Sequence, residues 1–516
     1  MKQSSCTPHH PWVIATLCGI TIALAAAMSP HAHADSLPAP QPLAKSRDMP
    51  PTQRVSALPA GWQYGAFMEI FVRAYQDSNG DGIGDLRGLI SRLDYLRDLG
   101  IKGIWLMPIT TSRDHDHGYA TTDYRAIEPD YGTLADFDEL LKQAHARGIG
   151  VIVDYVVNHA AITHPLFEQS ASSVDNPYRD WFVWQAAAPT GWDIWGKNPW
   201  TSTANGAYFA TFGPHMPDFN LRNPAVLDYH QDSLRFWLDR GLDGFRLDAM
   251  THLIENDSSQ WNDQPESRAL THQFQTLINS YPRRYTVCEA TANPMIYAAA
   301  EVCGSAFGFG HEHHIVEAAK GQPEAIQAVA DYFKTAPANM VVMVSNHDRF
   351  AGARLWDQVQ GDLAQYRLAA ATYLLQPGIP FIYYGEEIGM AGIPELKGDA
   401  ELRTPMSWRA DAKGFTRGKP FRPLSPNAAT HNAAAERRNP QSLWAFYKAM
   451  LALRNTRPSI AQGSYDAPFV QGQVLGFQRS FQREKTWVLI NYGTSDATVS
   501  LEGLPAGAKL QALYPK

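Results

Sequence analysis

Two carboxylates and an arginine stand where buried strands are predicted to end. Residues 244–248 (GFRLD) form a short apolar run that carries Arg246 and Asp248. Because side chains alternate along a strand, these two residues share one face, where the guanidinium favours the ionised carboxylate. A purely structural ion pair would show the same pattern, so this stretch alone leaves both interpretations open.

Three further stretches repeat the arrangement. Each is a β-rich apolar run that ends in polar, ionisable residues, and segments long enough for helices separate them: 151–159 (VIVDYVVNH), 285–289 (YTVCE) and 341–348 (VVMVSNHD). This alternation predicts an α/β barrel. In such barrels the active site lies at the carboxyl ends of the strands.

Asp248 and Glu289 fit the two duties of retaining glycosidic bond cleavage. One carboxylate must be ionised to attack the anomeric carbon, and the other must be protonated to donate to the leaving oxygen. Asp248 has Arg246 two residues away, which favours the charged form. Glu289 follows Val and Cys without an adjacent basic residue. We therefore expect Glu289 to have a raised pKa and to be the proton donor.

In their order and separation, the four stretches resemble the four signature regions of the α-amylase superfamily, glycoside hydrolase family 13. The resemblance extends from about Gly61 to the end of the chain. It implies a (β/α)8 TIM barrel as domain A (61–460), an inserted domain B after the third strand (160–223), and a short C-terminal β-sandwich as domain C (461–516).

The resemblance also implies roles for individual residues. Asp248 would be the nucleophile, Glu289 the general acid/base, and Asp348 a third catalytic carboxylate that holds sugar hydroxyls. Tyr119 would stack on the sugar. The full set of implied substrate-binding residues is Tyr119, His159, Arg246, His347, Asp116 and Arg403.

Two metal sites are predicted. Oxygen side chains recur at every second position from Asp77 to Asp85, which lets a loop wrap a hard cation such as Ca²⁺; many relatives have a calcium loop of this pattern. A bare Asp/Gly turn is the alternative. The ligands of this first site would be Asp77, Asn79, Asp81, Asp85 and the carbonyl of Ile83.

The second metal site follows from the resemblance. Asn158, Asp218 and His252 match positions that in many α-amylases bind a calcium ion between domains A and B, the histidine through its carbonyl. In the alternative, Asn158 only hydrogen-bonds domain B.

Two sets of residues point to different members of the family. Asp218 and His252 resemble amylases and the neopullulanase-like group. Asp116 and Arg403 resemble α-glucosidases, trehalose synthases and sucrose-acting relatives, in which this pair closes a pocket around a terminal glucose. We predict an α-1,4-glucan hydrolase of α-amylase type. An α-glucosidase or transglucosylase acting on maltose and short maltooligosaccharides is the alternative, and a non-catalytic binding subunit is a remote one because all three carboxylates are present.

The composition and the amino-terminal segment limit the possible binding partners and the cellular compartment. The chain has a net charge of −7 and no Lys/Arg cluster, which argues against nucleic acid and anionic membranes as partners. Residues 1–34 predict a cleaved signal peptide and 35–60 a flexible leader, so we expect a secreted or periplasmic protein without a membrane anchor. Cys288 and Cys303 remain after cleavage, in a compartment that permits a disulfide between them. The sequence does not indicate the oligomeric state.

Periodicity predicts the individual elements. Apolar residues at helical spacing predict helices over 86–99, 136–147 and 442–453, and a helix that opens at Asn223. The predicted terminal β domain begins at about Gly463. The predicted barrel strands are 64–72, 101–107, 150–157, 243–248, 285–289, a weaker one at 306–309, 341–344 and 379–384.

Overall fold

A parallel sheet that curves into a nearly closed barrel forms the centre of the protein. The computed structural model describes residues 56–501, 504 and 509–514, so the predicted signal peptide and most of the predicted leader lie outside the described residues. The strand order is β10-β9-β5-β2-β1-β12-β11, and every pairing is parallel. The strands are β1 (Phe67–Ile70), β2 (Gly103–Leu106), β5 (Gly150–Val156), β9 (Gly244–Asp248), β10 (Tyr285–Cys288), β11 (Val341–Val342) and β12 (Ile379–Tyr383).

The predicted strand at 306–309 is reduced to a short segment that joins the two edges of the sheet. Phe307 N–H donates to the carbonyl of Cys288 at 3.2 Å, and Val341 N–H donates to the carbonyl of Ala306 at 2.8 Å. Single bridges at the same residues connect this segment to β10 and β11. The barrel is thus closed by isolated hydrogen bonds at the position where the sequence pattern was weakest.

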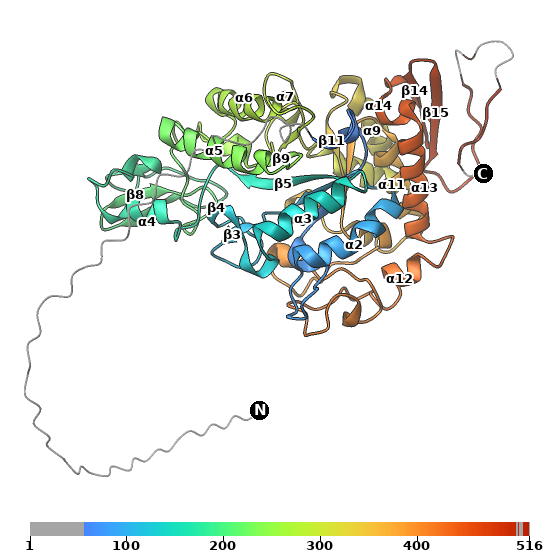
Figure 1. The fold of residues 1–516 in the computed structure, drawn as a ribbon. Coiled ribbons are helices and arrows are strands. Elements are labelled where there is room, and N and C mark those ends of the chain that lie inside the picture. Colours follow the sequence, from blue (N-terminus) through green and yellow to red (C-terminus); the bar gives the residue numbers. More distant parts are fainter. Residues whose placement is uncertain (1–55, 502–503, 505–508, 515–516) are drawn as a thin grey trace, which may run out of the picture. The chain divides into compact units, whose positions relative to one another are not determined.

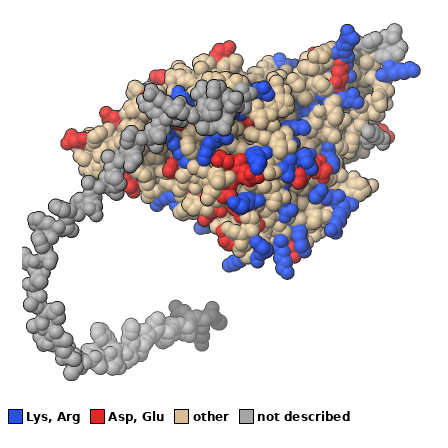
Figure 2. All heavy atoms as spheres, in the orientation of Figure 1, with Lys and Arg blue, Asp and Glu red and all other residues tan. Residues whose placement is uncertain are grey.

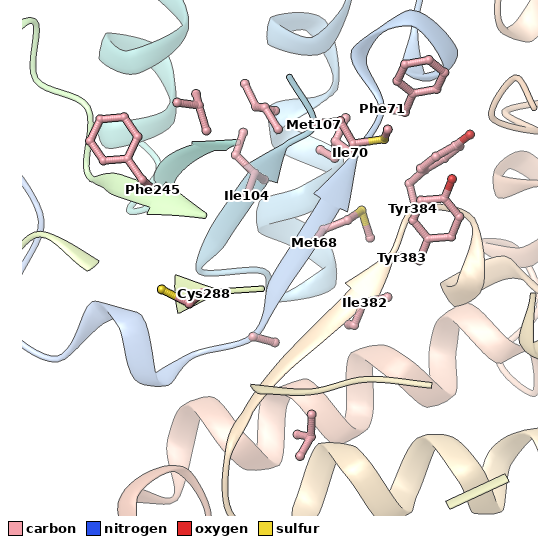
Figure 3. Packing of buried hydrophobic residues seen from close by; sticks show 14 of the residues in the cluster. Met68, Ile70, Phe71, Ile104, Met107, Phe245, Cys288, Ile382, Tyr383 and Tyr384 are labelled. Atoms are coloured by element: carbon pink, nitrogen blue, oxygen red, sulfur yellow. The ribbon is translucent and has the colours of Figure 1, made fainter. Parts of the chain in front are cut away.

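Side chains of the barrel strands alternate between two hydrophobic clusters. Phe67, Trp105 and Phe381 pack inside the barrel. Met68 and Cys288 point outward and pack under the surrounding helices, as Figure 3 shows for part of this outer cluster. Because of this alternation, Arg246 and Asp248 of β9 face inward while Phe245 and Leu247 face outward.

Helices cover the outside of the sheet (Figure 1). Local signals account for their ends: the Asp85 side chain caps the first long helix by accepting from Gly88 N–H, and Thr133 and Asp136 form a capping box on the next. Helices of eight or more residues are α2 (Leu86–Leu99), α3 (Leu134–His145), α4 (Pro165–Ser172), α5 (Pro224–Asp239), α6 (Pro265–Asn279), α8 (His311–Ala319), α9 (Pro323–Thr335), α11 (Leu363–Leu375) and α13 (Leu443–Thr456). Shorter ones are α1 (Val72–Tyr75), α7 (Pro294–Tyr297), α10 (Leu355–Gln358), α12 (Ala433–Glu436) and α14 (Pro458–Gln462).

Two small sheets lie outside the barrel. The insertion after β5 contains α4 and an antiparallel sheet of order β6-β8-β7, and it lies at the carboxyl end of β5 (Figure 1). Its strands are β6 (Trp184–Gln185), β7 (Trp200–Thr203) and β8 (Gly206–Phe209). The C-terminal β domain is an antiparallel sheet of β13 (Asp466–Gln471), β14 (Val474–Phe481) and β15 (Glu484–Asn491). A hairpin of β3 (Thr110–Ser112) and β4 (Thr121–Ile127) follows β2.

The end of the predicted flexible leader is packed against the barrel. Ser56 and Leu58 are buried, and the Ser56 hydroxyl donates to Asp243 Oδ1 at 2.6 Å. Asp243 also accepts from the backbone N–H of Val151 and contacts His145 Nε2 at 2.7 Å. The expectation of a mobile segment up to residue 60 is therefore wrong for residues 56–60, because a serine and a leucine there fill the base of the barrel.

Figure 2 shows how charges are distributed on one face of the protein. On the face in Figure 2, acidic and basic side chains are interspersed, without a broad patch of one sign. Among the described residues, none of the helices combines the length and the apolar character that crossing a bilayer requires.

Candidate active site

A cavity of about 630 Å³ opens at the carboxyl ends of the barrel strands. The three predicted catalytic carboxylates share it with residues of the inserted domain and of the loops after β2, β9 and β12. Its lining residues are His117, Tyr119, His159, Trp195, Phe212, Met216, Asp248, Ala249, Thr251, His252, Glu289, Thr291, Asp348, Phe350, Asp399 and Arg403. The predicted residues Arg246 and His347 lie directly beneath this lining.

Arg246 is the centre of the charge network at the cavity floor. Its Nη1 forms a short ion pair with Asp248 and a second one with Asp154, and its Nη2 lies 3.0 Å from Glu289 Oε2. The Arg246 side chain is only 1% exposed. One buried guanidinium therefore holds three carboxylates that come from three neighbouring strands or strand ends.

Burial dominates the electrostatics of Asp248. Removal from water raises its pKa well above the ordinary value; Arg246 opposes this shift, while Glu289 and Asp154 add to it. Burial also raises the pKa of Asp154 to about 6 against the attraction of Arg246. The three carboxylates are coupled through one cation, so protonation of one favours ionisation of its neighbours.

Glu289 has a basic neighbour that is distant in the sequence. Arg246 reaches it from the adjacent strand β9. Oε2 of Glu289 also accepts the backbone N–H of Ala249 at 2.9 Å. Ala249 has φ 53°, a strained conformation for a residue with a Cβ. Both contacts use Oε2, which leaves Oε1 available to a substrate.

His347 and Asp348 form the opposite wall of the pocket. His347 Nε2 lies 3.1 Å from Asp348 Oδ2 and 2.7 Å from the Tyr119 hydroxyl. Burial would raise the pKa of Asp348, but His347 and Arg403 hold it well below its usual range. Asp348 is thus an ionised acceptor suited to sugar hydroxyls.

His159 has the opposite character. Burial lowers its pKa to about 3, so the ring is neutral. Its Nε2 is buried and has no hydrogen-bond partner among the described residues, although the ring lines the cavity. An unsatisfied buried nitrogen costs stability unless a ligand satisfies it, and a sugar hydroxyl is a suitable partner.

The sequence analysis did not identify two carboxylates that contact the predicted site residues. Asp154 binds Arg246 and accepts from the Tyr119 hydroxyl at 3.0 Å. Glu69 contacts His347 Nδ1 at 2.5 Å. Asp154 could have been found, since it lies in the stretch 151–159 on the same strand face as Ile152 and Val156. The only sequence signal for Glu69 is that it is the single charged residue in an otherwise apolar strand.

The predicted pair of Asp116 with Arg403 is not formed. Arg403 donates to Asp348 at 2.9 Å and lies 3.2 Å from Asp399, whereas Asp116 pairs with Arg422 at 2.6 Å. Arg403 is engaged deep in the pocket, and Arg422 reaches Asp116 from a different loop. The described pocket is therefore not closed by an Asp116–Arg403 pair.

Aromatic rings form the rim of the cavity. Trp195 of the inserted domain is 61% exposed and Phe350 is 59% exposed. Trp195 packs against Phe212, with ring centroids 5.7 Å apart, and Phe212 packs against His159 at 5.1 Å. A continuous aromatic wall thus runs from the pocket floor to the rim, and such surfaces stack on sugar rings.

The loop of the first predicted calcium site offers the expected oxygen donors. Asp77 accepts the N–H groups of Gly80 and Gly82, and Asn79 and Asp81 accept the next but one N–H along the loop. Asp85 caps α2 and binds Ser78. No Lys, Arg or His of the described chain pairs with these three carboxylates, so their negative charge suits a hard cation. Their ligand atoms do not all lie within 4.8 Å of one another. Among the described residues, the group that brings three such ligands within 4.8 Å is His115, Glu128 and Asp130.

In the second predicted calcium site, the buried carboxylate of Asp218 accepts hydrogen bonds. Burial raises the pKa of Asp218 to about 7, opposed by hydrogen bonds from Thr211 and Asn158. Thr211 donates from its N–H at 3.1 Å and from its hydroxyl at 2.6 Å. The His252 ring stacks on Trp261. None of these contacts involves the carbonyl of His252, and the second calcium site stays a prediction.

Comparisons with known proteins agree with this site. The profile described as "Alpha amylase, catalytic domain" matches residues 69–463. The chain is 34% identical to α-amylase 3 of Dictyoglomus thermophilum, over 84% of this chain and 85% of that protein. It is 30% identical to a probable α-glucosidase of Rhizobium meliloti, over 85% of this chain and 91% of that protein.

Solved structures give the same result. The α-amylase from H. orenii superposes with a TM-score of 0.75 at 33% identity, covering 83% of this chain and 90% of that chain. An α-glucosyl transfer enzyme superposes with a TM-score of 0.75 at 28% identity, covering 84% of this chain and 91% of that one. With the barrel, the inserted domain and the carboxylates around Arg246, these matches show that the chain belongs to the α-amylase family of glycoside hydrolases, family 13.

Proposed function

We propose that this enzyme is an exported retaining hydrolase of α-1,4-glucosidic bonds in starch and maltodextrins. The observation that carries the proposal is the arrangement on Arg246, whose two terminal nitrogens hold Asp248 and Glu289 at the floor of one cavity. Carboxylates that share one guanidinium suit the short separation of about 5 Å that retaining enzymes use, better than the wider gap of inverting ones.

The first step forms a covalent intermediate. An oxygen of Asp248 attacks the anomeric carbon of the bound glucose, and the bond from that carbon to the leaving oxygen breaks. Glu289 gives its proton to the leaving oxygen, which departs as the 4-hydroxyl of the shortened chain. Asp348 and the Nε2 atom of His159 hold hydroxyls of the reacting sugar and so position the ring.

The second step restores the enzyme. Glu289, now ionised, takes a proton from water, and the water oxygen attacks the anomeric carbon. The ester bond to Asp248 breaks and returns the electron pair to its carboxylate. Two inversions at one carbon give net retention. A sugar hydroxyl in place of water would give transfer, with the same residues in the same roles.

The rim supports action on chains longer than one sugar. Trp195 and Phe350 are exposed on the lining of the cavity, where they can stack on the leaving sugar. The absence of an Asp116–Arg403 pair in the described structure removes the closure that the α-glucosidase alternative needs. These features favour an open cleft and cleavage within a maltodextrin.

The α-glucosidase or transglucosylase alternative has its own support. Several relatives are named α-glucosidase or trehalose synthase, and one similar structure is an α-glucosyl transfer enzyme. The deciding experiment is a time course of products from maltoheptaose alongside maltose. Mid-length products with intact maltose support the hydrolase. Glucose released one unit at a time from maltoheptaose, or products longer than maltose formed from maltose alone, would establish the alternative.

Calcium and export complete the proposal. The loop from Asp77 to Asp85 would hold Ca²⁺ through its carboxylates, Asn79 and the Ile83 carbonyl, and would stabilise the start of α2. Export agrees with the bonded pair Cys288 and Cys303, because disulfides persist in oxidising compartments. Amino-terminal sequencing of the mature protein from periplasm and medium tests export, and a start at residue 1 would contradict it.

A further inference from the structure

Glu69 is a carboxylate inside the barrel, where few charged groups are found. It lies on β1 between Met68 and Ile70, which face outward, and is 1% exposed. Burying a carboxylate is costly unless a cation or hydrogen-bond donors compensate for the lost water. Glu69 contacts the His347 ring, which lies directly beneath the sugar-binding pocket.

The contacts determine where the protons of His347 lie. Nδ1 is 2.5 Å from Glu69 Oε1, and Nε2 is 2.7 Å from the Tyr119 hydroxyl. The Tyr119 hydroxyl donates its own proton to Asp154, so it accepts from Nε2. Nε2 also faces Asp348 at 3.1 Å. Both ring nitrogens therefore act as donors, which is the state of a protonated imidazole.

The surrounding charges favour this state. Burial disfavours a charged ring, but Asp348 and Glu69 raise the pKa of His347 to about 10. The other titratable or charged groups facing this network are Tyr119, Asp154 on β5, Arg246 on β9, Tyr383 and Tyr384 at the end of β12, and Arg403, whose Nε donates to the His347 carbonyl. Burial raises the pKa of Glu69 itself, and His347 opposes that shift.

We propose that Glu69 is a positioning residue that keeps His347 protonated, so that Nε2–H remains directed at Asp348 and Tyr119 beneath the bound sugar. With Glu69 neutralised, the ring would lose its second proton. A neutral ring with its hydrogen on Nδ1 would make Nε2 an acceptor, and Tyr119 would turn from Asp154 toward it. The sugar-holding carboxylate would then lose a cationic neighbour. This inference rests on the proposed function of the pocket as an α-glucoside site.

Two substitutions at one position separate charge from shape. Glu69→Gln preserves a hydrogen-bond acceptor for Nδ1–H of His347 and removes the charge. Glu69→Asp keeps the charge on a side chain that is one methylene shorter. Glu386→Gln is the matched control, because Glu386 is an equally buried carboxylate that binds Tyr373 and Tyr447 and does not line the cavity. Circular dichroism melts verify that each variant is folded.

The first readout is the pH profile of kcat/KM with maltoheptaose. For Glu69→Gln we expect the basic limb to move to lower pH by about one unit or more, while Glu69→Asp and Glu386→Gln follow the parent. A structural role would lower the rate equally at every pH, and such a uniform loss, or a profile identical to the parent's, overturns the proposal.

The second readout does not depend on activity. Long-range ¹H–¹⁵N spectra of protein labelled at histidine report ring protonation, and His347→Gln identifies the relevant signals. We expect His347 to remain doubly protonated at about pH 8 in the parent and to be neutral in Glu69→Gln. A neutral ring in the parent overturns the proposal. Inactivity of the parent on every α-glucan would contradict the proposed function instead, and the spectra would still decide the role of Glu69.

Discussion

Arg403 and Asp348 form a buried ion pair in which Nη2 donates to Oδ1 over 2.9 Å. Arg403 therefore supports the carboxylate that we propose holds the reacting sugar, whether that sugar belongs to maltose or to starch. We expect Arg403→Ala to lower kcat/KM at least about tenfold, and by similar factors for maltose and for starch. Loss confined to maltose would contradict this role and restore a pocket closed for terminal glucose. Asp116→Asn, which disturbs only the pair with Arg422, is the matched control and should have a small effect.

The two carboxylates on Arg246 can be distinguished by the leaving group. Asp248→Asn removes the nucleophile and should cost several orders of magnitude with every substrate. Glu289→Gln removes the proton donor, so it should retain much more activity on α-glucosyl fluoride, whose leaving group needs no proton, than on maltoheptaose. Initial rates on both substrates test this assignment. Equal losses in Glu289→Gln on both substrates would contradict its role as the acid.

The bond between Cys288 and Cys303 spans 15 positions and starts at the last residue of β10. Closing a loop of this length should stabilise the fold by about 3 kcal/mol. Without reductant, the double variant Cys288→Ser/Cys303→Ser should melt at a lower temperature than the parent. With reductant, where the parent also lacks the bond, the two proteins should melt at the same temperature. Calorimetry with and without reductant measures this, and an unchanged melting temperature would show that the bond adds no stability.

Chelation tests the loop from Asp77 to Asp85. If Ca²⁺ binds there in the native state, its removal should lower the melting temperature, because a ligand that binds only the folded state stabilises it. Asp81→Asn should melt like the chelated parent and respond little to chelator. The metal content of the purified protein completes the test. Calcium retained by Asp81→Asn with an unchanged melt would place the ion elsewhere.

The buried carboxylate of Glu386 should make the free energy of unfolding depend on pH. Burial raises its pKa from an ordinary 4.5 to about 7. The folded protein keeps this proton at pH values where the unfolded chain has released it, so the free energy of unfolding should fall as pH rises from about 4.5 to about 7, by about 3 kcal/mol in total. Denaturant titrations across this window should show a flatter dependence for Glu386→Gln. The same pH dependence in the parent and in Glu386→Gln would contradict a raised pKa of Glu386.

The elements and the location of the site could be predicted from sequence because local patterns determine them. The prediction for 86–99 coincides with α2, since leucines at helical spacing and an Asp cap define both its face and its start. Carboxylates at strand ends were correctly placed around one cavity, since the closing of a barrel brings strand ends together.

Contacts between distant strands could not be predicted. Three contacts depend on the register of the barrel strands and on the path of the loops. They are the ion pair of Arg246 with Glu289, the ion pair of Asp116 with Arg422, and the contact of buried Glu69 with His347. The segment at 306–309 lacks a strong β pattern because only isolated hydrogen bonds, and not a full ladder, hold it in the barrel.

The contacts of Asp243 decide how the protein can be shortened or fused. This single carboxylate joins Ser56 to α3, to β5 and, through Arg284 at 3.3 Å, to the start of β10. An affinity tag attached upstream of Ser56 leaves these contacts of Asp243 intact. A truncation that begins after Leu58 would remove a hydroxyl partner and an apolar plug from the base of the barrel, far from the chemistry, and would yield an enzyme with intact catalytic groups on a less durable scaffold.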